Sequence, residues 1–450
     1  MIQTARSVAL DVLIAVSKDD AYANILLPTR IAAAHLDGRD AGLATELCNG
    51  TLRGRDFYRA VIGQCTDREI SKIHPVVLSV LEMGVHQHVA MRVSTHALVN
   101  ESVNLVKASG MSAASGFTNA VMRRVTERSL EQWQQKVTDN LVDETDRTAV
   151  LNSHPAWIVR ALSMALKADN RPNELGPLLA ADNSPGPLGI IDLRNAGEVL
   201  HSLVPARFSP LGFHLVASGN PNSITTPAKG RIRVQDEGSQ LAALMLAEVP
   251  ASADSNEWLD TCSAPGGKSA VLAWAAEKKG AHLTSNELNA IRLPLVKNSL
   301  APWPNVTITN VDGREFGKRE SRFSRILVDA PCTGLGALRR RPEARWRKTP
   351  ADVAQLTGLQ EELLLSAIDA LEPGGVVAYV TCSPHIAETR GVVSSALKKR
   401  PTMNELDARD VLQSIVRNPI DITGDALSVQ LWPHAHGTDA MFIALMRKDQ

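Results

Sequence analysis

The sequence predicts three domains: an all-α N-terminal domain, a small linking domain of mixed structure, and a C-terminal α/β domain of the Rossmann-like class. Three observations predict this fold class. The chain has 450 residues, which suggests two to four domains. Its first part keeps a helical spacing of apolar residues, and its last part alternates short apolar runs with helical patterns. We place the boundaries at residues 1–138, 139–232 and 233–450.

The composition is that of an ordinary folded protein. Apolar residues make up 44%, enough for sizeable cores. Lys+Arg and Asp+Glu are both 48, so the net charge is zero and a wholly basic nucleic-acid binder is excluded, although a local basic patch is not. The five cysteines form no C-x-x-C pair, so we expect no disulfide framework, no metal site and a cytoplasmic location. No apolar run is long enough to span a membrane.

Residues 1–138 read as helices separated by small-residue breaks. Val8, Val12 and Val16 follow helical spacing, and a second such pattern runs through residues 75–91. Residues 1–150 carry 16 Lys+Arg and 17 Asp+Glu, so this part is not an obvious electrostatic anchor for RNA. The linking domain, 139–232, contains turn-forming stretches such as DNSPGPLG.

From about residue 235, polar residues follow each short apolar run. The expected strands lie at 257–259, 282–284, 306–308, 326–328 and 376–380. A parallel sheet covered on both faces fits this rhythm, and such sheets bind ligands at the carboxyl ends of their strands. The residues at these ends are Asp260, Glu287, Asp312, Asp329 and Cys382.

The segment DTCSAPGGKSA follows a strand and opens a helix. It lacks the first glycine of a phosphate-binding P-loop and is not a dinucleotide G-x-G-x-x-G. A glycine loop with acids after the next two strands suits S-adenosylmethionine, because one acid can hold the ribose hydroxyls and the sulfonium needs no phosphate cradle. The alternative is that the segment is an ordinary strand-to-helix turn with no ligand. The candidate cofactor residues are Cys262, Ser263, Ala264, Pro265, Gly266, Gly267, Lys268, Glu287, Asp312 and Asp329.

Cys332 and Cys382 each lie just beyond the end of a strand of the same sheet. A thiolate in that place can be a nucleophile, and methylation of a pyrimidine at C5 needs one, because C5 becomes reactive only after a thiolate adds to C6. Asp329 near N3 of the ring would stabilise the developing charge. The alternative, a buried and inert cysteine, is favoured for Cys262.

The segment RRRPEARWRK, residues 339–348, has six basic residues and one acid. Most segments of this kind are solvated parts of the surface. Because this one adjoins Cys332, we favour contact of its cations with RNA phosphates and stacking of its tryptophan on a base or ribose. The candidate RNA-binding residues are Arg339, Arg340, Arg341, Arg345, Trp346 and Arg347. His385, His434 and His436 are weaker candidates, for which a structural role is favoured.

These motifs resemble those of the RNA (cytosine-C5)-methyltransferases. VQDEGSQLA, DTCSAPGGK, VDGREF, DAPCTGLGALRRRPEARW, YVTCSPH and LWPHAHGTDAMF occur in that family's order, and LVNESVNLVKASG and GFTNAVMRRV are similar to the antitermination factor NusB. Together they look like the ribosomal small-subunit RNA methyltransferase B family, also called Fmu or Sun. The resemblance implies a NusB-like RNA-binding domain and an S-adenosylmethionine-dependent catalytic domain.

The resemblance further implies that Cys382 is the nucleophile, that Cys332 helps product release, and that the target is one cytosine of 16S rRNA, acted on before the subunit is complete. We expect a monomer. Two other readings stay open: the same chemistry on tRNA, and a non-catalytic RNA-binding factor of ribosome assembly.

Overall fold

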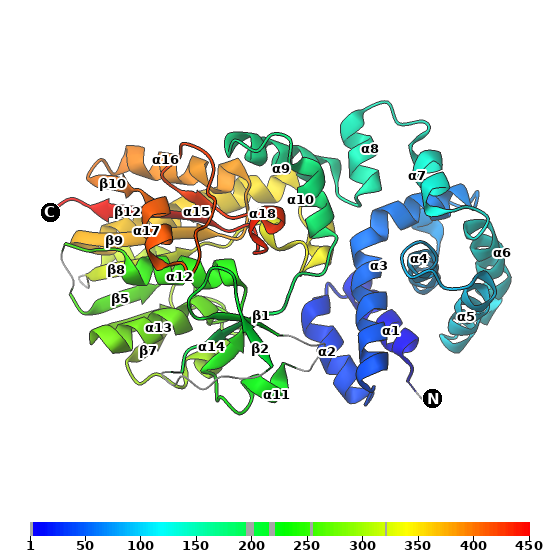
Figure 1. Cartoon of the computed structure of the whole chain (residues 1–450), viewed down its shortest axis with the longest axis horizontal. Helices are drawn as coiled ribbons and strands as arrows, with labels where there is room; N and C mark the ends of the chain where they lie inside the picture. The colour runs from blue at the N-terminus through cyan, green and yellow to red at the C-terminus, as the bar shows by residue number, and fades with distance from the viewer. Residues whose placement is uncertain (1–2, 195–201, 216–220, 253–254, 320–321) are drawn as a thin grey trace. The chain divides into compact units, whose positions relative to one another are not determined.

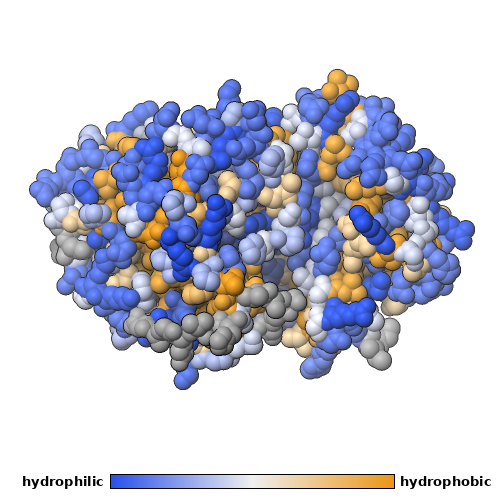
Figure 2. All heavy atoms as spheres, viewed as in Figure 1, coloured by the Kyte–Doolittle hydropathy of each residue, from blue (hydrophilic) through white to orange (hydrophobic). Residues whose placement is uncertain are grey.

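The computed structural model describes residues 3–194, 202–215, 221–252, 255–319 and 322–450, and the chain divides into two compact units. The N-terminal unit contains Met1–Arg160, Leu179–Pro185 and Leu338–Arg347, and the C-terminal unit contains Ala161–Leu178, Gly186–Ala337 and Lys348–Gln450. This division differs from the three domains expected, because no separate unit corresponds to residues 139–232. In the view of Figure 2, the outer surface is mainly hydrophilic.

The N-terminal unit is helical, as expected. Its first helix starts where a Thr4–Ser7 capping box satisfies the free N–H groups. Apolar side chains at helical spacing then build its core, in which Leu13, Leu47 and Val80 are fully buried. The helices are α1 Ala5–Lys18, α2 Ala23–Ala33, α3 Gly38–Gln64, α4 Pro75–Val89, α5 Thr95–Ala108, α6 Ser115–Val125, α7 Leu130–Thr138 and α8 Glu144–Leu151, followed by α9 Ala156–Ala168 and α10 Leu175–Asp182, which each have residues in both units.

The first sheet of the C-terminal unit is small and antiparallel. Its order is β2-β3-β1-β4, with β1 Gly189–Asp192, β2 Leu203–Pro205, β3 Gly212–Leu215 and β4 Ile232–Val234. The linking segment therefore folds partly as helices and partly as this sheet, which leads into α12, Glu237–Glu248.

The large sheet has the order β10-β12-β9-β8-β5-β6-β7, and β11 pairs with β12. Five expected strands are present and mutually parallel, from β7 to β9. β12 runs antiparallel to β9 and β10, which the sequence analysis did not predict. The strands are β5 Glu257–Asp260, β6 His282–Asn286, β7 Val306–Thr309, β8 Phe323–Asp329, β9 Leu371–Thr381, β10 Met403–Leu406, β11 Val429–Gln430 and β12 Phe442–Lys448.

Helices cover both faces of this sheet, and each face has its own apolar core (Figure 1). One face packs against α12, α13 Gly267–Lys279 and α17 Ala408–Ile415, and the other against α15 Pro350–Ala370 and α16 Arg390–Lys399. Because both faces are buried, the central strands are continuous apolar runs rather than alternating ones. The carboxyl ends of β5, β6, β8 and β9 are thereby fixed along one edge of the sheet.

Candidate active site

The glycine loop between β5 and α13 is built mainly from backbone hydrogen bonds. Ser263 donates through both N and Oγ to the carbonyl of Asn286, each at 2.8 Å. Gly266 has φ 101°, and a Cβ there would lie 2.4 Å from Cβ of Ser299 on α14, Leu293–Leu300. Glycine is thus needed for its backbone conformation and for packing against α14. No described side chain caps α13, so its first N–H groups remain for a ligand.

The carboxylates after β6 and β7 hold different partners. Glu287 accepts the N–H of Ala264 through Oε2 at 3.1 Å and the N–H of Asn289 through Oε1 at 2.8 Å, so it supports the glycine loop directly. Asp312 pairs with Arg314 at 2.6 Å. The hydrogen bond from Arg314 is the main reason that the pKa of Asp312 is lowered.

Asp260 ends β5 and was given no role by sequence reasoning. It is fully buried, accepts Ser269 Oγ at 2.6 Å and accepts the N–H of Cys262 at 3.3 Å. Burial raises its pKa to about 7, although the Ser269 bond opposes that shift. The signal in the sequence was its position as the first residue of the glycine-loop motif.

The structure brings the two predicted cysteines together. Cys332 follows β8 and Cys382 follows β9, and their Sγ atoms lie 3.4 Å apart. Both residues are half-buried. The shared hydrogen bond is the largest influence on each: it raises the pKa of Cys332 and lowers the pKa of Cys382. The directions of the two pKa shifts favour Cys332 as the donor and Cys382 as the acceptor of this hydrogen bond.

Lys268 and Asp329 form an ion pair beside these thiols, with Nζ 2.7 Å from Oδ2. Burial lowers the pKa of Lys268, but the charge and hydrogen bond of Asp329 outweigh it, so the pKa is raised. The cationic Lys268 in turn lowers the pKa of Cys382. The sequence placed Lys268 among the cofactor residues and did not predict this pairing.

Backbone contacts fix the cysteine loops to each other. Gly336 donates its N–H to the carbonyl of Cys382 at 2.8 Å and accepts the N–H of Ala440 at 2.8 Å. A Cβ on Gly336 would lie 2.2 Å from the carbonyl oxygen of Ala440. The loop after β8 thus reaches the loop after β9 only because residue 336 has no side chain.

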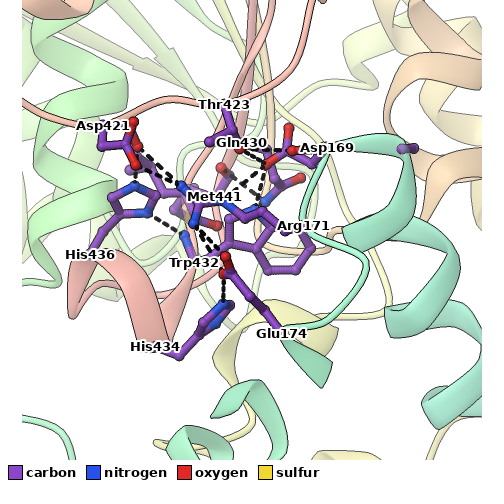
Figure 3. A network of polar contacts seen from close by, with 12 residues as sticks. Asp169, Arg171, Glu174, Asp421, Thr423, Gln430, Trp432, His434, His436 and Met441 are labelled. Atoms are coloured by element: carbon purple, nitrogen blue, oxygen red, sulfur yellow. Dashed lines mark hydrogen bonds and ion pairs between the residues drawn. The ribbon is translucent and has the colours of Figure 1, made fainter. Parts of the chain in front are cut away.

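The three candidate histidines have structural partners. His385 Nδ1 accepts the N–H of Ala387 at 3.2 Å. His434 Nε2 lies 2.7 Å from Glu174, and His436 accepts the N–H of Trp432 at 2.8 Å (Figure 3). Burial lowers the pKa of His436 to about 4, which keeps that ring neutral. The network in Figure 3 fixes the loop after β11, and its other labelled residues are Asp169, Arg171, Asp421, Thr423, Gln430 and Met441.

The basic segment requires a correction, because part of it lies inside the N-terminal unit. Arg345 is fully buried in η5, Pro342–Trp346, and Arg339 is 5% exposed. Neither side chain has the solvent exposure that contact with RNA phosphates would require. Arg345 donates to the carbonyl of Ser153 at 2.9 Å and to Oδ1 of Asn183 at 2.8 Å. Of the other candidates, Arg340 and Arg341 are exposed, whereas Trp346 and Arg347 are half-buried.

The described residues contain no group of three or more His, Cys, Asp or Glu side chains arranged to hold a metal ion. Within the same ranges, no helix combines the length and apolarity that crossing a membrane requires.

Two family models match parts of this chain. The family model described as 16S rRNA methyltransferase RsmB/F matches residues 247–447, and the NusB family model matches residues 3–127. A Mycobacterium tuberculosis protein named as a methyltransferase is 42% identical over 450 residues, covering 99% of this chain and 96% of its own. The ribosomal RNA small subunit methyltransferase B of Pseudomonas syringae pv. tomato is 30% identical, covering 89% and 88%. The crystal structure of PH0851 shares the fold, with a TM-score of 0.80 at 18% identity over the whole of both chains.

Proposed function

The chain belongs to the 16S rRNA methyltransferase RsmB/F family, and from this premise we propose that it transfers a methyl group from S-adenosylmethionine to C5 of one cytosine in 16S rRNA. The observation that carries the proposal is the thiol pair, 3.4 Å apart, beside the Lys268–Asp329 ion pair. Free thiols at the site suit the reducing cytoplasm in which rRNA is made.

The residues of the glycine loop fit S-adenosylmethionine. The uncapped N-terminus of α13 offers N–H donors for its carboxylate, and Glu287 and Asp312 follow the next two strands, where ribose hydroxyls and the adenine edge would lie. The bound donor supplies an electrophilic methyl group. Within this arrangement, Glu287 both supports the loop and presents its carboxylate at the ribose position.

The first chemical step is addition of Cys382 to the ring. The thiolate forms a bond to C6, the C5–C6 π electrons become available at C5, and negative charge also develops towards N3. The proton that Lys268 shares with Asp329 stabilises that charge. Carbon C5 would then bond to the methyl carbon while the bond between that carbon and the sulfonium sulfur of the donor breaks, and the sulfur would keep the electron pair as a neutral thioether.

Product release reverses the addition. A base removes the C5 proton, the C5–C6 double bond forms again, and the bond between C6 and the Cys382 sulfur breaks. While Cys382 is bound to carbon its sulfur is neutral, so the anion that held the proton on Cys332 is gone and Cys332 ionises more readily. A Cys332 thiolate formed at this stage assists release.

Activity and substrate are tested together. The full chain is incubated with labelled S-adenosylmethionine and unmodified 16S rRNA, with tRNA in parallel, and the product is mapped by bisulfite sequencing. We expect one protected cytosine in 16S rRNA. Label in tRNA alone would overturn the substrate, and label in neither RNA, from folded protein that binds the methyl donor, would favour the non-catalytic assembly factor.

Replacing the nucleophile separates chemistry from binding. We expect Cys382→Ala to reduce methyl transfer at least about 10³-fold, because the only proposed attacking group is lost. Binding of S-adenosylmethionine, measured by calorimetry, should stay within about twofold of wild type, since the bond of Gly336 to residue 382 uses the backbone. Residual turnover near the wild-type rate would remove Cys382 from the mechanism.

Replacing the second thiol should trap the intermediate. In Cys332→Ala, addition and methylation can proceed but release is slowed, so a covalent protein–RNA adduct should accumulate. A denaturing gel with RNA and S-adenosylmethionine would show it as a slower band. The matched control is the double variant Cys332→Ala, Cys382→Ala, which should show none. Absence of the band in the single variant would contradict the release role.

A further inference from the structure

One buried carboxylate of the C-terminal unit connects the two cysteine loops. Glu388 ends the short helix η6, Ile386–Glu388, and is fully buried. Its Oε1 accepts the N–H of Thr333 at 2.8 Å and Nε2 of Gln360 at 3.1 Å. Its Oε2 accepts Ser383 Oγ at 2.7 Å and also the hydroxyl of Thr333. Four donors thus converge on one side chain.

The donors are the immediate neighbours of the thiols. Thr333 follows Cys332 and Ser383 follows Cys382, and their hydroxyls also lie 3.1 Å from each other. The carboxylate therefore holds the end of each cysteine loop next to its reactive residue. Gln360 adds a third element, because it donates from α15 to the carbonyl of Pro331 at 2.9 Å.

The charge of Glu388 is solvated by neutral donors. The ion pairs found among the described residues do not include it, and each of its four partners is an amide or a hydroxyl. Donors of this kind take the place of water around a carboxylate, and a charge at Glu388 acts on nearby groups through a region of low dielectric constant.

We propose that Glu388 is a positioning residue, which holds the two thiols in register and keeps their shared proton on Cys332, so that Cys382 is the nucleophile. The proposal rests on the function proposed above and deepens it. It explains in physical terms why two thiols at the same edge of one sheet take different roles: Glu388 bonds the residue after Cys332 twice, through both N–H and hydroxyl, and the residue after Cys382 only once.

The other charged and titratable groups around the pair act mainly on Cys382. Lys268 of α13 lowers its pKa, while Asp329 at the end of β8 and Asp439 before β12 raise it. Facing Cys332, Glu388 raises the pKa of the thiol. The Tyr379 hydroxyl of β9 donates to the carbonyl of Glu388, and burial raises its pKa, so it stays neutral.

The test uses the full chain without RNA or methyl donor. Iodoacetamide alkylation of Cys332 and Cys382 is followed from pH 6 to 10 by peptide mass spectrometry. Wild type should react first at Cys382. In Glu388→Gln, which keeps the size of the side chain and removes its charge, the preference for Cys382 should fall about tenfold, which corresponds to a shift of about one pKa unit.

The matched control is Ser383→Ala, which keeps the charge of Glu388 but removes the hydroxyl that donates to it, contacts the hydroxyl of Thr333 and accepts the N–H of His385. Because the charge remains, its preference should stay within about twofold of wild type. Glu388→Asp keeps the charge but moves it away from Thr333, so we expect a smaller loss of the preference for Cys382, about threefold. If the glutamine variant does not fold, this variant tests the proposal in its place. Wild-type preference in a folded Glu388→Gln or in Glu388→Asp would overturn the proposal. Because alkylation needs no substrate, that result would leave the proposed methyl transfer standing or falling on its own assay.

Discussion

At the scale of single residues, the site depends on one cation placed among three anionic or potentially anionic groups. Lys268 lies 2.7 Å from Asp329 and its charge lowers the pKa of Cys382, whereas Asp329 and Asp439 raise it. Of the main influences that the described residues have on Cys382, the hydrogen bond from Cys332 and the charge of Lys268 are the two that lower its pKa. The lysine therefore acts on the nucleophile as well as on the acid with which it pairs.

This balance predicts a shift in pH dependence. In Lys268→Met the pKa of Cys382 should rise by about one unit, so less thiolate is present at pH 7 and the rate profile moves to higher pH. Alkylation of Cys382 should slow about tenfold at pH 7 and recover towards pH 10. Lys268→Arg keeps the charge and is the control. An unshifted profile in the methionine variant would mean that the ion pair does not act on the thiol.

At the scale of elements, the apolar runs predicted the central strands well and the edge strands poorly. Runs such as 326–328 are buried on both faces and stand out. The sequence predicted neither β12, of which only Phe442 lies in a quoted motif, nor β10, which is a short edge strand. Strand order then places Asp329, Cys332 and Cys382 together. Side-chain pairing such as Glu388 with Thr333 and Ser383 depends on tertiary packing and has no signal in sequence spacing.

The basic segment, residues 339–348, likewise shows that sequence spacing does not reveal which charged side chains are buried. Six cations in ten residues predict a solvated or RNA-binding face, but local composition does not reveal which guanidinium meets buried carbonyls. Arg345 does so in η5, where it bonds Ser153 and Asn183 and also donates to the carbonyl of Asp182 at 3.3 Å. Its function in this structure is to hold the N-terminal unit together.

Arg345→Met should therefore destabilise the N-terminal unit. Four acceptors lose their donor, at a cost of about 2–4 kcal/mol in the free energy of unfolding: the carbonyls of Arg53, Ser153 and Asp182, and Oδ1 of Asn183. For a unit of this size, the corresponding melting transition should fall by about 5–12 °C. Differential scanning calorimetry of the full chain would measure it. Arg341→Met changes an exposed arginine of the same segment, and a fall as large in that variant would argue against the buried contacts as the cause.

At the scale of the whole molecule, the chain leaves the C-terminal unit at residue 338 and returns to it at residue 348. The loop that carries Cys332 therefore continues directly into a segment whose partners belong to the N-terminal unit. Glu343 in that segment is 1% exposed and accepts the N–H of Ala23 at 3.3 Å. We therefore expect residues 338–347 to hold a fixed conformation only when residues 1–160 are present.

Limited proteolysis tests this dependence. A C-terminal piece, residues 161–450, keeps Asp182 and Asn183 but lacks Ala23 and Ser153, so η5 loses the N–H that donates to Glu343 and the Ser153 carbonyl that accepts from Arg345. Trypsin should then cleave after Arg345 and Arg347 at least about tenfold faster than in the full chain, because cleavage requires local opening and opening no longer breaks those contacts. Peptides from β8 and β9 serve as the internal control, since the sheet is built within the C-terminal unit and should stay resistant in both proteins.

Equal protection of Arg345 in the two proteins would mean that the segment folds without the helical unit. Faster cleavage confined to residues 338–348 would instead show that the helical unit, which has no net basic charge, helps to order the loop that follows Cys332. This would be a contribution to the proposed reaction that does not require the helical unit to bind RNA itself.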